Sequence, residues 1–166
     1  MQEVLQTKVT DSEGKVTYQR FDALNRVFQT IRKVGDTADL LDANDVATTT
    51  YFDSIGNRTA VADAENKMTY FQYDNLNRLV KQIRKVGDTA NVEDADDAVT
   101  TMSYNEVGNL LSSTQPNGIT ASRTYDVLNR VLTETNGAGE VTSFSYDAVG
   151  NTLSITQPNG NVITNV

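Results

Sequence analysis

The sequence predicts an all-β protein of tandem antiparallel β-hairpin repeats, each about 21 residues long, stacked as a twisted strip or a β-solenoid-like array. Three observations lead to this fold class. An aromatic residue followed by Asp or Asn recurs six times, a Gly or Asn stands four positions after each aromatic, and no long window has helical periodicity. The aromatic anchors are Phe21, Phe52, Tyr73, Tyr104, Tyr125 and Tyr146. Their steps of 31, 21, 31, 21 and 21 residues make residues 1–166 a single array in which two repeats carry an insertion.

Each repeat is expected to turn directly after its aromatic residue. Asp at the first turn position can accept a hydrogen bond from the backbone N–H two residues on. The residue that closes the turn enters the left-handed region, where residues other than Gly and Asn lose roughly 1 to 2 kcal/mol. The predicted left-handed turn residues are Asn25, Gly56, Asn77, Gly108, Asn129 and Gly150. A strand, this turn and a returning strand make one hairpin.

An aliphatic residue stands just before each left-handed residue, where a polar residue is usual. These residues are Leu24, Ile55, Leu76, Val107, Leu128 and Val149. A lone hairpin is marginally stable in water, whereas stacked repeats bury one another's faces. We therefore expect the aliphatic residues and the six aromatics to form the core. Leu128→Ala should then cost about 2 to 5 kcal/mol.

A second set of turns joins one hairpin to the next. The chain begins with a strand-like stretch over residues 4–10 that runs into a turn at residues 11–15. The later turns include two copies of Gln-Pro-Asn-Gly, in which Pro fixes φ early and Gly accepts positive φ late. A left-handed residue is predicted seven positions before four of the aromatics, at Gly14, Asn66, Gly118 and Gly139.

The repeats also alternate in pairs. The first, third and fifth turns end in Asn-Arg, with Arg26, Arg78 and Arg130, and the others end in Gly-Asn, with Asn57, Asn109 and Asn151. A shift of 52 residues overlays residues 31–38 on residues 83–90 without a mismatch, which indicates duplication of a two-hairpin block. We expect each Arg to reach carboxylates of a neighbouring hairpin.

The two insertions, residues 35–47 and 87–98, are acidic and are predicted to be longer loops on one edge of the array. Clustered carboxylates suit calcium, so the calcium candidates are Asp42, Asp45, Asp94, Asp96 and Asp97. Their spacing matches no known calcium loop, and a solvated acidic loop explains them equally. No other cofactor or metal is expected.

The amino-acid composition argues against several classes of function. With no His and no Cys, the common general base and the thiol nucleophile are missing, so an enzyme is not expected. A net charge of −8 disfavours nucleic acid as a partner. No segment approaches the roughly 18 apolar residues of a membrane span, and residues 1–5 do not resemble a signal peptide.

The pattern Tyr-Asp-x-x-Gly/Asn-Asn/Arg resembles the YD repeat of the Rhs family, which occurs in Rhs polymorphic toxins, Tc-toxin shell components and teneurins. The resemblance covers about residues 14–166. It departs from the family in the turn, where the usual Gly-Arg is split into Asn-Arg and Gly-Asn. Neither the family's self-cleaving core motif nor a toxin domain is visible.

The resemblance implies a structural role as one segment of a β-hairpin wall or shell, located outside the cell or on the bacterial surface. The expected partners are further YD repeats of the same or another chain, including end-to-end pairing through open strand edges. The alternative is an adhesion or carbohydrate-binding module that uses the loops or the aromatic row to hold a glycan.

Overall fold

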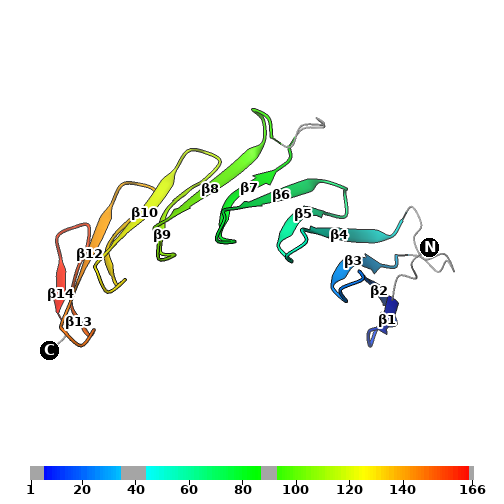
Figure 1. The fold of residues 1–166 in the computed structure, drawn as a ribbon, viewed down its shortest axis with the longest axis horizontal. Coiled ribbons are helices and arrows are strands. Elements are labelled where there is room, and N and C mark those ends of the chain that lie inside the picture. Colours follow the sequence, from blue (N-terminus) through cyan, green and yellow to red (C-terminus); the bar gives the residue numbers. More distant parts are fainter. Residues whose placement is uncertain (1–5, 35–43, 87–92, 165–166) are drawn as a thin grey trace. The chain divides into compact units, whose positions relative to one another are not determined.

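The computed structural model describes residues 6–34, 44–86 and 93–164, and these residues form strands and turns with no helix (Figure 1). The strands are β1 (Gln6–Thr10), β2 (Val16–Phe21), β3 (Val27–Arg32), β4 (Val46–Phe52), β5 (Arg58–Ala62), β6 (Met68–Tyr73), β7 (Leu79–Arg84), β8 (Ala98–Tyr104), β9 (Leu110–Thr114), β10 (Thr120–Tyr125), β11 (Val131–Thr135), β12 (Val141–Tyr146), β13 (Thr152–Thr156) and β14 (Val162–Thr164). Each strand neighbours the next one in the chain, in a single open sheet. The predicted all-β class and tandem hairpins are confirmed.

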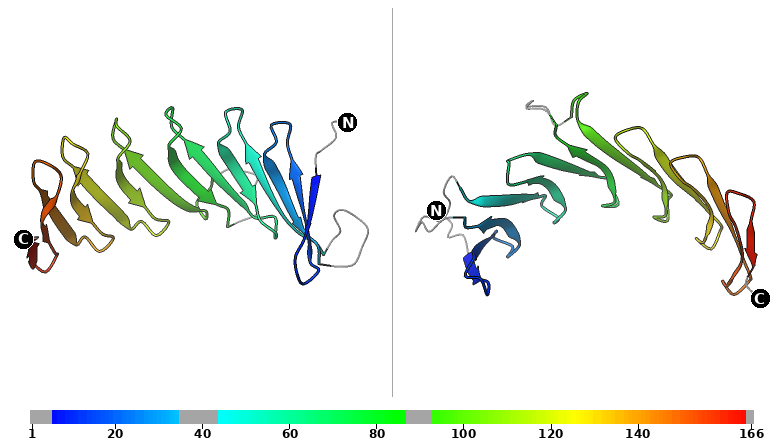
Figure 2. Two further views of the ribbon diagram at one scale, coloured as in Figure 1. Left: turned by 90° about the horizontal axis from the view of Figure 1, so that it is seen from below. Right: turned by 180° about the vertical axis from the view of Figure 1, so that it is seen from behind.

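Backbone contacts divide the chain into two parts. The first part comprises Met1–Gln72 and Ile83–Asp97, and the second comprises Tyr73–Gln82 and Ala98–Val166. Strands β1 to β6 pair consecutively and antiparallel in the first part, and β8 to β14 do so in the second (Figure 2). The boundary falls within the hairpin formed by β6 and β7.

Because consecutive strands are antiparallel neighbours, successive turns alternate between two edges of the sheet. The six turns that follow the aromatic anchors join β2 to β3, β4 to β5, and so on to β12 and β13, so within each part these turns belong to one edge. The register shifts at the last strand pair before these turns, as between Thr124 and Tyr125. A type I turn followed by a left-handed residue produces such a bulge.

The core is small because the sheet is a single layer. Among the described residues, the buried apolar side chains are Ile31, Ala60, Ala62 and Ile83, and both isoleucines have no exposed surface. Ile31 and Ile83 occupy equivalent positions in the duplicated block. The six aromatic anchors are half-buried rather than fully buried.

The prediction that the aliphatic turn residues belong to the core is wrong. These side chains are exposed by 62 to 84%, and the set comprises Leu24, Ile55, Leu76, Val107, Leu128 and Val149. Each occupies the third position of its turn, beyond the end of the paired strands, where the single-layer sheet provides nothing to cover it. Neighbouring hairpins pair through their strands and leave their turn tips in solvent.

The predicted insertions are shorter than expected. Residues 46–47 belong to β4 and residue 98 begins β8, so the loops end earlier than the predicted limits of 47 and 98. They join β3 to β4 and β7 to β8, at the edge opposite the aromatic turns. Residues 35–43 and 87–92 lie outside the described residues. In the part of the chain that the structure covers, no helix is long and apolar enough to span a membrane.

Candidate functional site: the linked hairpin turns

The turn after Tyr125 shows how one Asp organises the backbone. Asp126 N donates to the carbonyl of Arg130 at 2.9 Å, and Asn129 N donates to the carbonyl of Asp126 at 3.0 Å. The side-chain Oδ1 of Asp126 accepts hydrogen bonds from the backbone N–H groups of Leu128 and Arg130, both at 2.9 Å. The carboxylate therefore satisfies the N–H groups that the turn leaves unpaired, as the sequence predicts.

The residues predicted to be left-handed all have positive φ. Among the aromatic turns, φ is 60°, 59° and 64° at the asparagines and 101°, 96° and 99° at the glycines. These residues are Asn25, Asn77, Asn129, Gly56, Gly108 and Gly150. The turns at the opposite edge use the same conformation, with φ of 80°, 61°, 80° and 82° at Gly14, Asn66, Gly118 and Gly139.

The turn carboxyl groups are held in their ionised form. The backbone N–H of Arg130 is the main cause that lowers the pKa of Asp126, partial burial opposes it, and the Arg130 side chain lowers it further. Hydrogen bonding by the Asn151 side chain is the leading cause that lowers the pKa of Asp147. The pKa values of three further turn carboxyls are lowered as well, at Asp22, Asp53 and Asp74.

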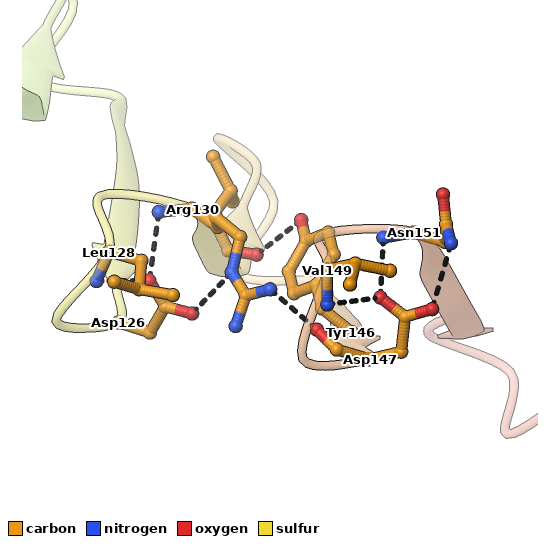
Figure 3. Close-up of polar contacts among 8 residues, drawn as sticks. Asp126, Leu128, Arg130, Tyr146, Asp147, Val149 and Asn151 are labelled. Atoms are coloured by element: carbon orange, nitrogen blue, oxygen red, sulfur yellow. Dashed lines mark hydrogen bonds and ion pairs between the residues drawn. The ribbon is translucent and has the colours of Figure 1, made fainter.

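The arginine of each odd-numbered turn links its own turn to the next hairpin. Arg130 Nε donates to Asp126 Oδ2 at 2.7 Å, within the turn, while Nη1 donates to the backbone carbonyl of Asp147 at 2.9 Å. Its guanidinium also lies 4.7 Å from the ring centre of Tyr146 (Figure 3). The prediction that arginines reach carboxylates of a neighbouring hairpin is therefore wrong, because Asp126 already takes the charge and the neighbour supplies a carbonyl and a ring.

The same arrangement recurs at the equivalent arginines. Arg78 bonds Asp74 Oδ2 at 2.7 Å and the carbonyl of Asn105 at 2.6 Å, and it lies 5.0 Å from the ring centre of Tyr104. In the first part, Arg26 pairs with Asp22 and lies 4.5 Å from the ring centre of Phe52. Arginine suits this position because its planar group donates in several directions and stacks on rings at once.

The tyrosine anchors make the return contact. Tyr146 OH donates to the carbonyl of Val131 at 2.8 Å, and Val131 is the first strand residue after the preceding turn (Figure 3). Tyr125 OH bonds Leu110 O at 2.9 Å and Tyr104 OH bonds Leu79 O at 3.0 Å in the same way. Each of these tyrosine hydroxyls thus donates a hydrogen bond to the hairpin that precedes it.

The even-numbered turns use asparagine where the odd-numbered turns use arginine. Asn151 Nδ2 donates to Asp147 Oδ2 at 2.8 Å, which repeats the in-turn contact without a charge (Figure 3). Asn109 Nδ2 instead donates to Asn129 Oδ1 at 2.8 Å, in the next turn along the edge. Asparagine is too short to reach a neighbouring ring, so the long forward contacts belong to the arginines.

Three of the calcium candidates in the described residues, Asp45, Asp94 and Asp97, pair with lysines. Asp45 Oδ2 lies 2.6 Å from Lys33 Nζ, and both side chains are nearly fully buried. In the duplicated block, Lys85 Nζ lies 2.6 Å from Asp97 and 2.9 Å from Asp94. These pairs close the bases of the two insertions, so a cation at these oxygens would have to displace an ammonium group.

The described residues contain no group of three or more His, Cys, Asp or Glu side chains placed to hold a metal ion. Asp96 is exposed, and Asp42 lies outside the described residues. The hydrogen bond that Lys85 Nζ donates to Asp97 Oδ2 is the main cause that raises the pKa of the Lys85 ammonium and lowers the pKa of the Asp97 carboxyl.

The fold and the linked turns define the class: this is a tandem β-hairpin repeat protein. Residues 104–141 and 125–162 each match the family described as RHS Repeat, at two overlapping repeats of the second part. Residues 104–162 thus carry RHS repeats, and the other aromatic turns of the chain resemble them in their turn motif. A comparison with curated protein sequences gives no match.

Three solved structures are similar to this chain in fold. The crystal structure of TcdB2-TccC3-Cdc42 has a TM-score of 0.64 at 17% identity, covering 92% of this chain and 9% of that chain. The Photorhabdus luminescens Tc holotoxin pore with a mutated TccC3 has a TM-score of 0.63 at 20% identity, and the match covers 86% of this chain and 7% of that chain. The crystal structure of TcdB2-TccC3 without its hypervariable C-terminal region has a TM-score of 0.63 at 18% identity, and the match covers 86% of this chain and 8% of that chain. The chain thus spans less than a tenth of the length of each.

Proposed function

We propose that this chain is a non-enzymatic structural segment that builds part of a β-hairpin wall or shell in a larger, secreted or surface-exposed Rhs/YD-repeat protein. The observation that carries the proposal is the two-way link between successive turns. Arg130 reaches forward to Tyr146 and Asp147, and Tyr146 reaches back to Val131. At this turn the arginine and the tyrosine side chains are used to join hairpins.

The turn carboxylates support a structural role over a catalytic one. A general acid at neutral pH needs a carboxyl group with a raised pKa. The pKa of Asp126 is lowered instead, and both of its oxygens accept hydrogen bonds from its own turn. The same holds for the pKa of Asp147. These groups are suited to holding backbone, not to transferring protons.

The wall is proposed to continue through its edge strands. Among the described strands, β1 and β14 are the outermost of the sheet, and each pairs with a single described neighbour. The unpaired backbone groups of an edge strand accept another strand readily. Further YD repeats, of the same longer chain or of another copy, are the partners that fit this edge. The likeness to Tc-toxin components supports an extracellular location.

The test is the size distribution of the purified chain against concentration, by gel filtration with light scattering, with and without calcium. The particle size of a wall segment should increase with protein concentration and should not depend on calcium. The second measurement is amide hydrogen exchange on the Arg130→Gln variant. The amides of residues 146–151, in the hairpin that Arg130 contacts, should exchange faster than in the unsubstituted chain. The exchange rates in the strands of the first part should not change. A chain that stays monomeric and shows no change at residues 146–151 would contradict the proposal.

The alternative, an adhesion or carbohydrate-binding module, has one supporting observation. An open hollow on the first part is lined by Tyr51, Thr59, Ala60, Met68 and Tyr70. Tyr51 is 49% exposed and lies opposite Ala60, which in turn lies opposite Tyr70. Aromatic rings beside a small residue suit a sugar ring. Saturable glycan binding that Tyr51→Ala abolishes would favour this function, provided that Tyr18→Ala, in β2 and not part of the lining of the hollow, leaves binding intact.

A further inference from the structure

A lysine and an aspartate are buried against each other at the base of each insertion. Lys85 Nζ lies 2.6 Å from Asp97 Oδ2, and the exposed fractions of the two side chains are 7% and 0%. In the duplicated block, the same distance separates Lys33 Nζ from Asp45 Oδ2, with exposed fractions of 8% and 0%. A nitrogen nucleophile and a carboxyl group are thus in contact, out of water, at two equivalent places in the chain.

The backbone holds the Lys85–Asp97 pair in place from both sides. Lys85 N donates to the carbonyl of Met68, in β6, at 2.9 Å, which fixes the base of the lysine side chain. Asp97 Oδ1 accepts from Val86 N at 3.2 Å, and Asp97 Oδ2 accepts from Asp94 N at 3.0 Å. Each carboxyl oxygen therefore faces a backbone N–H group. Such donors stabilise the negative charge that develops on oxygen when a carboxyl carbon is attacked.

A second carboxylate is positioned to take a proton from the lysine. Asp94 Oδ2 lies 2.9 Å from Lys85 Nζ, which is within the distance for direct proton transfer. The other oxygen of Asp94 accepts from Asp96 N at 3.3 Å. At the first insertion the corresponding residue, Asp42, lies outside the described residues. The second insertion therefore shows a complete set of nucleophile, carboxyl group and proton acceptor.

We propose that Lys85 and Asp97 join in an intramolecular isopeptide bond, with Asp94 transferring the protons. Asp94 carries one proton from the ammonium to Asp97 Oδ2, so that a neutral amine faces a neutral carboxyl group. The nitrogen lone pair attacks Cγ of Asp97, and Val86 N stabilises the charge on Oδ1. Asp94 then moves a second proton from the nitrogen to Oδ2, which leaves as water. The third proton stays on the amide nitrogen, and Asp94 ends as a carboxylate.

Burial favours the amide over the ion pair. An ammonium and a carboxylate lose their hydration when they are buried, and their attraction offsets that loss only in part. The amide carries no charge, and its formation releases a water molecule. The bond also closes the second insertion covalently, in a chain that has no cysteine for a disulfide. A cross-link of this kind restricts the unfolded chain and so stabilises the folded one.

Bond formation is expected to be slow, because the charged pair is the resting form. The hydrogen bond between the two side chains is the leading cause that raises the pKa of Lys85 and lowers the pKa of Asp97. The neutral pair that reacts is therefore a minor species. The bond should accumulate after folding is complete. A chain kept unfolded should not form it, because only the fold holds the two side chains together.

The first experiment follows the intact mass of the full chain by mass spectrometry after refolding from urea. We expect the refolded chain to lose one water at this site with time, while a chain held in urea keeps the mass of its sequence. Lys85→Arg keeps a positive charge beside Asp97, but a guanidinium does not lose its proton, so this variant should lose one water fewer. Lys81→Arg, in β7, is the matched control and should lose as much water as the unsubstituted chain.

Asp94→Asn tests the proton transfer. Asparagine keeps the size of the side chain and an oxygen that accepts hydrogen bonds, but it does not take up a proton. We therefore expect the rate of water loss to fall by about tenfold or more. Asp96→Asn, at the exposed neighbour, should leave the rate unchanged. Urea unfolding of both variants checks that the fold is intact, and an unchanged rate in a folded Asp94→Asn chain would rule out the role of Asp94.

The second experiment locates the bond by digestion with trypsin. We expect one cross-linked peptide that contains residues 85 and 97, with no cleavage after Lys85, because its amine has become an amide. A cyclic imide at an aspartate also loses one water, but hydroxylamine opens it and it does not require Lys85.

Two results would overturn the isopeptide bond. One is a chain that keeps the full mass of its sequence after prolonged incubation in the folded state, and the other is a loss of water that Lys85→Arg leaves intact. Neither result bears on wall assembly, because strand pairing at β1 and β14 does not involve this site.

Discussion

The guanidinium of Arg130 lies 4.7 Å from the ring centre of Tyr146 and donates to the carbonyl of the next residue, Asp147. Tyr146 in turn donates its hydroxyl to Val131, the residue that follows Arg130. The two side chains therefore cross between successive hairpins in opposite directions. This pair of contacts converts hairpins that would be marginal alone into a continuous array.

Tyr146→Phe tests the return contact. The substitution removes the hydroxyl that donates to Val131 O at 2.8 Å and keeps the ring beneath Arg130. We expect the free energy of unfolding to fall by about 0.5 to 1.5 kcal/mol, the net value of one hydrogen bond. Urea unfolding measures it. The positions equivalent to Tyr146 already hold Phe at residues 21 and 52, so a complete loss of folding would contradict this interpretation.

Gly150→Val tests the left-handed turn position. Gly150 has φ of 99° and no atom within 4 Å of the position that a Cβ would take, so the cost is that of the backbone alone. We expect destabilisation of at least about 1 to 2 kcal/mol. Asn25→Gly, at φ of 60°, should be nearly neutral in the same urea measurement. Equal effects of the two substitutions would show that positive φ is not the controlling property.

A pair of substitutions tests where the core lies. Leu128 is 62% exposed and Ile31 has no exposed surface. Leu128→Ala should therefore change the free energy of unfolding by no more than about 0.5 kcal/mol, whereas Ile31→Ala should cost about 2 to 5 kcal/mol. Both are measured by urea unfolding at low protein concentration. A large loss for Leu128→Ala would place that residue in the core after all.

Acid should destabilise the array through its turn carboxylates. The folded pKa of Asp126 is lowered relative to an unfolded value of about 3.9. Ionised Asp126 therefore contributes stability that is full above the unfolded pKa and is lost as pH falls through the folded pKa. Unfolding free energy should be level from neutral pH to about pH 5 and fall below about pH 4.

Asp126→Asn provides the control for the pH dependence. Asn105 already fills the equivalent position, and its Oδ1 accepts the backbone N–H of Asn109 at 2.8 Å. The variant should fold and should show a shallower decline of the urea midpoint between pH 5 and pH 3, a window of about two units around the unfolded pKa. An unchanged slope would show that the Asp126 carboxyl does not contribute.

Asp97→Asn tests the base of the second insertion. Asp97 lies 2.6 Å from Lys85, and its side chain is fully buried. Removing its charge takes away the shorter of the two ion pairs of the buried Lys85 ammonium with Asp97 and Asp94, so the melting temperature should fall. Asp96→Asn, at an exposed neighbour, should leave the melting temperature unchanged. Calcium should stabilise neither variant if the lysine holds these oxygens.

The sequence by itself determined the hairpins. Turn chemistry is local, so Asp126 and the left-handed Asn129 specify a turn without reference to the rest of the chain. Six copies of that turn then specify the strand order and, within each part, place the aromatic turns on one edge. This is why the fold class, the turn residues and the family could be predicted from residues alone.

Only the tertiary structure decided burial and the partners of long side chains. Recurrence of an aliphatic residue such as Leu128 shows that the position is constrained, but it does not show whether the constraint is a core or an exposed contact. Recurrence of Arg130 likewise does not show that its acceptor across the seam is the carbonyl of Asp147. Every residue carries a backbone carbonyl, so the sequence does not indicate which carbonyl will accept this hydrogen bond. The single-layer sheet settles the exposure of Leu128, because tips beyond the paired strands have nothing to cover them, and the position of the next hairpin settles the acceptor of Arg130.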